Sequence, residues 1–413
     1  MKRRQHSTVA FAAGVAVGLV LAAGGGVALA AGDVDGAYKK LRVFSQVLTY
    51  VQQSYVDEVD GDELVYDAVV GMLSGLDPHT VFMRPAEYEK LREDTVGEFG
   101  GLGIEVGVAG DVIQVEVVHA ESPGEHAGLR PGDRILAVDA ESLRGQPIEA
   151  SVRLMRGLPG TRVVLTVERK GWDRPRDIPL VRRQVRVPSV ELEDLGDGVA
   201  YVRIRAFQER TDYELAGALA DLKRRTKEQG RALPAGLVLD LRDNPGGLLD
   251  EGVRVADRFL ADGIIVTTKG RNPRNTEVEN ARPDGTEPDY PIAIVVNDGT
   301  ASASEIVAGA LQDHHRASIV GTRTFGKGSV QTLFGLDDGA GLKLTIARYF
   351  TPSGRSIQDI GIEPDVPIRP ADDLPAGLKG KERLQRDPQI GAAVEALRRG
   401  PKNLARGQPA RQE

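Results

Sequence analysis

The chain has 413 residues, of which 41% are hydrophobic and 27% charged, and its formal net charge is −7. This length accommodates two or three domains with their own cores. The acidic balance and the lack of a basic stripe argue against a nucleic-acid binder. The absence of cysteine excludes disulfides, thiol nucleophiles and thiolate metal sites.

The first 32 residues predict an export segment. Three basic residues, 2–4, precede 26 uncharged residues, 7–32, that are rich in Ala, Val and Leu. Residues 28–30 (Ala-Leu-Ala) form a small-x-small cleavage pattern, and the apolar stretch is long enough to span a bilayer if it is not cut. We expect a signal peptide or a retained membrane anchor. In either case the basic flank leaves the rest of the chain in the periplasm or another extracytoplasmic space.

Residues 33–96 predict a small helical region. Leu41, Phe44 and Leu48 recur at three- and four-residue spacing, as on one face of a helix, and a second helix is expected after them. We interpret this hairpin as a packing or dimerisation unit, which leaves a homo-oligomer open. No catalytic role is expected for His79.

Residues 97–172 predict an inserted β-rich domain. A glycine run over 100–104 leads into strands at 106–108 and 111–118, a turn-rich run at 122–133, a helix at 148–155 and a strand at 163–167. This order resembles a PDZ domain. The resemblance implies that Gly101, Leu102, Gly103 and Ile104 receive a peptide C-terminal carboxylate on backbone N–H groups, and that the peptide adds beside them as a strand. A plain hairpin turn is the alternative for the glycine run.

Residues 173–370 predict an α/β core. Apolar strands alternate with helical stretches beyond residue 198, as in a largely parallel and buried sheet. A connector rich in proline and arginine is expected at 174–188, and a long polar loop at 271–290. Residues 371–413 are mostly charged, with one apolar helical patch at 390–397, and are expected to form a C-terminal tail.

Two interpretations of Ser302 compete. The pattern Ser302-x-x-Glu305 is a capping box that starts a helix. The turn at 297–299, however, places the serine at a strand-to-helix bend, where the helix N-terminus favours developing negative charge. A lysine framed by glycines, Lys327, follows 25 residues later. A nucleophile is the better interpretation of Ser302, and Ser304 is the competing candidate.

Lys327 is the predicted proton acceptor. A desolvated lysine can replace histidine beside a nucleophilic serine, because burial lowers its pKa from about 10.4 towards neutrality. The run 324–328 (Thr-Phe-Gly-Lys-Gly) contains no acid that would hold the amine charged. His314 and His315 lie about 18 Å along the helix from Ser302, which is too far for a hydrogen bond. A surface lysine in a glycine turn is the alternative.

A second glycine motif, Asn244-Pro-Gly246-Gly247, ends another buried strand and precedes a helix. The N–H of Gly246 or Gly247, with that of Ala303, would form an oxyanion hole for acyl transfer. A helix-entry turn without catalytic function is the alternative, and the sequence does not choose between the two glycines.

A nucleotide site is the weakest interpretation. Residues 321–327 are a near-match to a phosphate-binding loop, but Gly328 stands where Ser or Thr would hold magnesium. The chain also lacks His-Glu-x-x-His and any aspartate series with metal spacing, so no metal or other cofactor is expected.

The stretches 297–305 and 324–331, together with Asn-Pro-Gly-Gly, resemble those of the carboxyl-terminal processing peptidases, also called tail-specific proteases. The resemblance covers the chain from Leu41 to Val366. It implies a multidomain α/β serine-protease core, a crotonase/ClpP-like spiral, with an inserted PDZ domain and an N-terminal helical region. It also assigns to Gln331 the role of orienting the lysine, for which an ordinary polar strand residue is the alternative.

Two positions depart from the family pattern. Thr300 stands where the family usually has serine, and Asp359 where it usually has glycine. Neither belongs to the implied catalytic set.

These observations together predict an exported serine endopeptidase with a Ser302–Lys327 dyad, which cleaves proteins after its PDZ domain recognises their C-terminal region. The expected partners are proteins or peptides with free C-termini. A non-enzymatic PDZ-type adaptor at the cell surface is the alternative.

Overall fold

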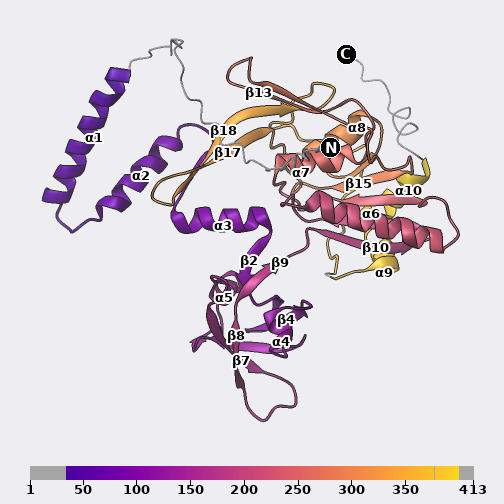
Figure 1. The fold of residues 1–413 in the computed structure, drawn as a ribbon, viewed down its shortest axis with the longest axis horizontal. Helices are drawn as coiled ribbons and strands as arrows, with labels where there is room; N and C mark the ends of the chain where they lie inside the picture. Colours follow the sequence, from indigo (N-terminus) through magenta and orange to yellow (C-terminus); the bar gives the residue numbers. More distant parts are fainter. Residues whose placement is uncertain (1–33, 376, 400–413) are drawn as a thin grey trace, which may run out of the picture. The chain divides into compact units, whose positions relative to one another are not determined.

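The computed structural model describes residues 34–375 and 377–399 (Figure 1). One compact unit extends to Val69 and a second begins at Val70. The first contains helix α1, Val34–Ser54, and most of helix α2, Gly61–Leu73, which form where the apolar spacing predicts helices. The predicted export segment at 7–32 lies outside the described residues. Within the described part of the chain, no helix is long and apolar enough to cross a membrane.

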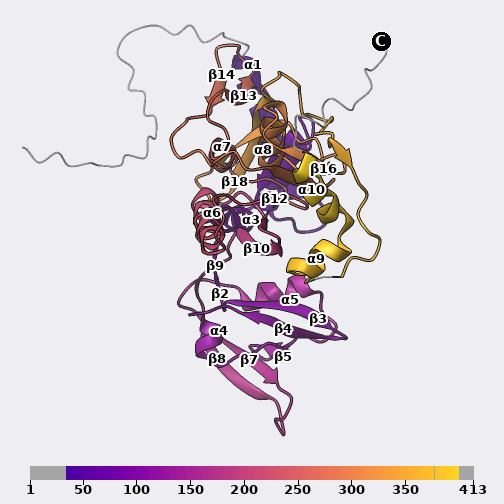
Figure 2. The same cartoon turned by 90° about the vertical axis from the view of Figure 1, so that its right-hand side faces the viewer.

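The PDZ-type domain is inserted between two neighbouring strands. Strand β2, Glu98–Gly101, pairs antiparallel with β9, Arg183–Arg186. Between them lie strands β3 to β8, which form one sheet in the order β3-β4-β5-β7-β8 with β6 beside β5 (Figure 2). The elements are β3 Ile104–Ala109, β4 Val112–Val118, α4 Pro123–His126, β5 Arg134–Val138, β6 Glu141–Ser142, α5 Ile148–Met155, β7 Arg162–Glu168 and β8 Arg176–Val181.

The prediction of a connector at 174–188 is wrong, because this stretch forms strands β8 and β9. Ile178 and Leu180 alternate with the exposed residues Asp177, Pro179 and Val181 and pack into the core of the inserted domain. This period of two is the signature of a half-buried strand, and the arginines and proline around it obscure the pattern in the sequence. The sheet of the inserted domain therefore continues to Val181.

The α/β core is built on a six-stranded sheet in the order β10-β11-β12-β15-β16-β19. The strands are β10 Val190–Gly196, β11 Val199–Ile204, β12 Gly236–Asp240, β15 Ile292–Val296, β16 Ser318–Gly321 and β19 Val366–Pro367. All neighbours are parallel except the edge pair β10 and β11. The connecting helices are α6 Thr211–Glu228, α7 Leu249–Asp257 and α8 Ala303–Asp313. This confirms the predicted α/β core.

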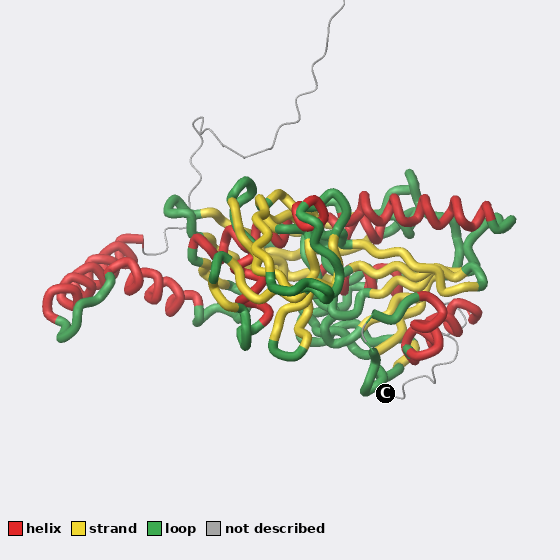
Figure 3. Tube along the Cα trace, turned by 90° about the horizontal axis from the view of Figure 1, so that it is seen from below, coloured by secondary structure: helices red, strands yellow, loops and turns green. Residues whose placement is uncertain are grey.

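Helices cover both faces of this sheet (Figure 3). In β12, Leu237 and Leu239 pack in the cluster that contains residues of α6, α7 and α8, whereas Val238 packs with residues of α10. Because successive side chains of a strand point to opposite faces, a sheet covered on both sides needs apolar residues throughout. This explains why β12 and β15 are buried along their whole length.

Helices α9, Gly380–Arg386, and α10, Pro388–Arg399, lie in the segment that the sequence sets apart as a tail. Ile390 and Leu397 of α10 are buried against the sheet. Arg242, at the end of β12, pairs with Asp240 at 2.6 Å and with Asp387 at 2.9 Å. Apolar packing and a buried ion pair thus both attach α10 to the core.

The core contains a second sheet. Its order is β1-β18-β13-β14, and β17 also pairs with β18. The strands are β1 Val81–Met83, β13 Ile264–Gly270, β14 Thr276–Asn280, β17 Ser329–Gly335 and β18 Gly341–Phe350, and helix α3, Pro85–Val96, follows β1. Strand β14 lies inside the stretch 271–290 that the sequence predicts to be a loop. Since β18 pairs with β1, β13 and β17, it joins segments far apart in the chain.

Candidate active site

Ser302 lies at the bend between β15 and α8, as the sequence predicts. Its backbone has φ 57° and ψ −119°, a conformation that costs a residue other than glycine about 1–3 kcal/mol. Asn297 fixes the preceding turn, because its side-chain oxygen accepts hydrogen bonds from Asp243 N–H at 2.9 Å and Gly299 N–H at 3.1 Å. The bend brings Ser302 to the wall of a cavity of about 390 Å³.

The neighbouring hydroxyl groups, those of Ser304 and Thr300, are buried and donate hydrogen bonds to the main chain. Ser304 is fully buried, donates to the carbonyl oxygen of Asn244 at 3.1 Å, and is not among the residues that line the cavity. Thr300 is also buried and donates to the carbonyl oxygen of Leu241 at 2.7 Å. The hydroxyl at position 300 therefore has a structural function that a serine would also serve. Ser302, which lines the cavity, has better access to a substrate than Ser304.

Glu305 joins the serine segment to the lysine segment. Its carboxylate accepts hydrogen bonds from the N–H groups of Ser302 at 2.9 Å, Gly326 at 2.8 Å and Lys327 at 2.9 Å, and from the Thr324 hydroxyl. The side chain is fully buried. Burial raises the pKa of Glu305, and the hydrogen bonds from Thr324 and the three N–H groups oppose that rise. The capping-box residue of the sequence is thus also a bridge between the two predicted catalytic residues.

Lys327 lines the same cavity as Ser302. Burial lowers the pKa of its amine, the positive charge of Lys343 lowers it further, and the charge of Glu305 acts in the opposite direction. The chain continues from Lys327 into strand β17 rather than into a helix. The near-match to a phosphate-binding loop consequently lacks the helix N-terminus that would bind phosphate.

Tyr349 is a buried residue of the site that the sequence identified only as the end of a strand. Its hydroxyl donates to the carbonyl oxygen of Lys327. Burial raises the pKa of Tyr349 well above its usual value, the charge of Glu305 adds to this, and a hydrogen bond with the Ser302 side chain opposes it. Tyr349 thus contacts both predicted catalytic residues from β18.

Gln331 lies on β17 and also lines the cavity. Its side-chain nitrogen donates to the Ser329 hydroxyl at 2.8 Å and lies 3.4 Å from the Thr345 hydroxyl of β18. Thr345 in turn donates to Asp77 at 3.1 Å, and its N–H donates to the Thr80 hydroxyl at 3.2 Å. A chain of hydrogen bonds therefore connects Gln331 to residues 77–80.

The segment 77–80 lies near the two lysines of the cavity. Burial lowers the pKa of His79, the charges of Lys327 and Lys343 lower it further, and those of Asp77 and Asp359 oppose this. The carboxylate of Asp77 accepts three hydrogen bonds from within its own turn, two from N–H groups and one from the Thr80 hydroxyl. Nothing in the sequence pattern of residues 77–80 links this segment to a strand more than 260 residues away.

The glycine motif after β12 lies against Ser302. A Cβ atom on Gly246 would lie 2.7 Å from the Ser302 Cβ and 2.9 Å from the Ala303 nitrogen, so no larger residue fits there. The Gly246 N–H donates to the Asn244 side chain at 2.9 Å. Within the described residues, the N–H groups of Gly247 and Ala303 donate to no protein acceptor. The N–H of Gly247 is thus available to a ligand, whereas the N–H of Gly246 is already bonded.

The predicted peptide-binding loop lies between β2 and β3. Gly103 has φ 67°, and a Cβ atom there would lie 2.2 Å from the Ser122 Cβ. Leu102 is buried, and its carbonyl oxygen accepts a hydrogen bond from Gly124 N–H at 2.7 Å. Gly101 ends β2 and Ile104 begins β3, which is an edge strand of its sheet. Among the described residues no strand pairs with the outer edge of β3.

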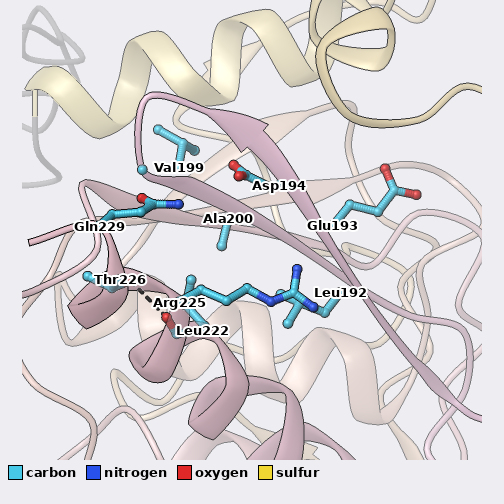
Figure 4. Close-up of a pocket in the computed structure, with 10 residues that line it drawn as sticks. Leu192, Glu193, Asp194, Val199, Ala200, Leu222, Arg225, Thr226 and Gln229 are labelled. Atoms are coloured by element: carbon cyan, nitrogen blue, oxygen red, sulfur yellow. Dashed lines mark hydrogen bonds between the residues drawn. The ribbon is translucent and has the colours of Figure 1, made fainter. Parts of the chain in front are cut away.

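Another hollow of the core is much smaller. It lies between β10, β11 and α6, is lined by Leu192, Ala200, Leu222 and Arg225 among others, and has a volume of about 20 Å³ (Figure 4). A volume of this size holds a water molecule and no more. Of these two, the cavity at Ser302 is large enough for a peptide segment.

Comparisons with known proteins agree with this geometry. A model of peptidase family S41 matches residues 198–368, a PDZ-domain model matches residues 114–169, and a model of the N-terminal domain of the activating protease CtpB matches residues 27–86. A carboxy-terminal-processing protease of Bartonella bacilliformis is 42% identical over 346 residues, which cover 84% of this chain and 78% of the relative.

A carboxyl-terminal-processing protease of Synechocystis is 40% identical over 310 residues, covering 73% of this chain and 70% of the relative. Among solved structures, a putative S41 protease from Bacteroides fragilis has a TM-score of 0.51 at 17% identity, with 86% of this chain and 97% of that chain covered. This last likeness concerns the fold alone.

We expect Glu305→Gln to lower both stability and peptidase activity. The amide NH₂ would face N–H donors that now share a carboxylate oxygen, and a buried unsatisfied donor costs about 1–3 kcal/mol. Urea unfolding and hydrolysis of an unfolded protein measure the two effects. The exposed Glu363→Gln is the matched control. Unchanged stability and turnover in Glu305→Gln would show that the carboxylate does not hold the two segments.

Proposed function

Because the chain belongs to peptidase family S41, we propose that Ser302 is its nucleophile and Lys327 the general base. The chain is a serine peptidase with a PDZ domain, of the carboxy-terminal-processing kind. The observation that carries the assignment is that both side chains, from segments joined through Glu305, line one cavity. A lowered pKa of Lys327 supports it, since only the neutral amine accepts a proton.

In the proposed reaction the Ser302 hydroxyl attacks the carbonyl carbon of the scissile peptide bond, and Lys327 takes the hydroxyl proton. The lysine then gives this proton to the leaving amine, which leaves an acyl-enzyme on Ser302. A water molecule, deprotonated by Lys327, hydrolyses the ester and restores the serine. Gln331 would orient the lysine. Its side-chain oxygen accepts no hydrogen bond from the described residues and is therefore available to the amine.

The oxyanion hole is assigned to the N–H groups of Gly247 and Ala303. The N–H of Gly246, the other candidate, already donates to Asn244. Gly246 instead has a steric function, because its lack of a side chain allows the motif to approach Ser302. The N–H of Ala303 is at the N-terminus of α8 and that of Gly247 lies in the turn before α7, and two such donors suit the negative charge of a tetrahedral intermediate.

The loop 101–104 is proposed to bind the C-terminal region of the substrate. Its glycines and the open edge of β3 suit a terminal carboxylate and an added strand. Arg156 of the inserted domain lies 4.0 Å from Asp94 of α3, and Asp94 lines the catalytic cavity. This contact offers a route by which peptide binding affects the cavity.

Export is proposed from the basic and apolar N-terminal segment, with the mature chain outside the cytoplasm. Sequencing the N-terminus of the protein recovered from cell fractions distinguishes a cleaved signal peptide from a retained anchor. Recovery of the intact chain from the cytoplasm would contradict export.

Ser302→Ala and Lys327→Ala should each reduce turnover by about a thousandfold or more, and the double variant should be no worse than either, because the two groups act as a unit. Hydrolysis of an unfolded protein measures this. Ser304→Ala distinguishes the two serines of the turn and should retain turnover. Near-normal activity of Ser302→Ala would exclude the proposed nucleophile.

The rate should rise with pH through the lowered pKa of Lys327 and reach a plateau above it. The sign follows because protonation removes the base, so activity is lost as pH falls. The measurement is kcat/KM against pH with an uncharged peptide. A rate that stays constant while pH falls well below neutrality would show that no lysine base takes part.

Peptides with a free, apolar C-terminus should bind the full-length Ser302→Ala protein in the micromolar range, about −8 kcal/mol. Amidation of the C-terminus should weaken binding about tenfold, because the N–H donors of the loop lose a charged acceptor. Acetylation of the peptide N-terminus is the control. Equal affinity of acid and amide would remove carboxylate recognition and leave the dyad unaffected.

A further inference from the structure

Lys343 is a second lysine in the catalytic cavity. It lies on β18 directly opposite Leu333 of β17, and Thr345 lies opposite Gln331. Residues two apart on a strand point to the same face, so Lys343 shares a face with Thr345 and lies about 7 Å along the strand from it. Lys343, Leu333 and Gln331 all line the cavity that contains Ser302.

The amine of Lys343 has no partner among the described residues. It makes no ion pair and no hydrogen bond there, although the residue is half-buried. Lys223 of α6 is a useful comparison, because its amine pairs with the buried Glu287 at 2.7 Å. Partly buried charges in proteins are usually paired. An unpaired one on a cavity wall is available to a ligand of opposite charge.

The acids near Lys343 are engaged elsewhere. Asp77 accepts hydrogen bonds from its own turn and from Thr345. Asp94, the acidic residue among those that line the cavity, lies 4.0 Å from Arg156. Glu305 is occupied by four donors in the core.

The two lysines of the cavity have different functions. Burial and the charge of Lys343 lower the pKa of Lys327, which favours the neutral amine that a base requires. The lowered pKa of His79 leaves its ring neutral near neutral pH. Lys343 is therefore the positive charge that a bound substrate meets beside the dyad.

We propose that Lys343 binds a carboxylate of the peptide substrate and so makes the enzyme prefer an acidic group close to the scissile bond. The carboxylate comes from an Asp or Glu side chain or from a chain terminus lying in the cavity. This inference rests on the proposed cleavage at Ser302. It concerns a site distinct from the loop 101–104 of the inserted domain.

The test uses the full-length protein and quenched peptides in which Glu replaces Gln at one position at a time on either side of the scissile bond. Each pair is also made with free-acid and amidated ends. We expect a Glu preference in kcat/KM of about tenfold at one or two adjacent positions, since hydrogen bonds to charged groups contribute about 1.5–3 kcal/mol. Measurement on the pH plateau separates this preference from any change in the pKa of Lys327.

Lys343→Gln should bring the Glu/Gln ratio close to one, mainly through KM, and Lys343→Arg should retain most of it. Lys381→Gln, an exposed lysine of α9, is the matched control and should leave the ratio unchanged. A preference that follows the side chain identifies an internal acid, and one that follows amidation identifies a terminal carboxylate. Equal ratios in the parent protein and Lys343→Gln would overturn the proposal.

A parent protein that hydrolyses no peptide would instead contradict the proposed function. Peptide binding to Ser302→Ala, compared with Ser302→Ala combined with Lys343→Gln, then tests the carboxylate site separately. Tighter binding of Glu peptides that is lost with Lys343 supports the site. Identical affinities in the two variants overturn it even if one of them is less stable.

Discussion

Four hydrogen-bond donors meet at the carboxylate of Glu305, and three of them are N–H groups that cannot act as acceptors. Only a group with two oxygens and about four lone-pair positions satisfies all of them in the interior. The serine bend and the lysine loop are both attached to this group. The strained backbone of Ser302 is therefore maintained by contacts outside the bend itself, as a residue at a sparsely populated φ/ψ requires.

Strand β18 provides the second constraint. It pairs with β1, β13 and β17, and it supplies Tyr349, Thr345 and Lys343 to the site. Because side chains alternate along a strand, one register error between β17 and β18 would turn Gln331 away from the cavity. The hydrogen bonds of Thr345 with Asp77 and Thr80 fix this part of β18 from its other side. The region before the inserted domain is consequently linked by hydrogen bonds to Gln331, which lines the cavity at Ser302.

The sequence predicted those features that depend on short stretches of chain. The bend at Ser302, the parallel core and the glycine run before β3 each have a local signature of turns, alternation or capping. Tyr349, Lys343 and Thr345 could not be identified in this way, since their function follows from strand register and pairing over long separations. The packing of α10 was missed for a related reason. Its apolar residues follow a highly charged segment, and only the open face of the sheet explains their burial.

The position of α3 has a consequence for how the inserted domain could control cleavage. The end of α3 is held by Gln208, whose side chain donates to the Asp94 carbonyl at 3.1 Å, and by Glu209, whose N–H donates to the Thr95 carbonyl at 3.1 Å. Leu91, Asp94 and Thr95 line the cavity, and β2 follows α3 directly into the inserted domain. The glycine between them, Gly97, has φ 75° and accommodates the change of direction. A change in the orientation of β2 would therefore act on a wall of the cavity rather than on the proposed dyad, whose two segments are joined through Glu305. Control of this kind would change substrate access, and therefore KM, more than it would change the rate of the chemical step.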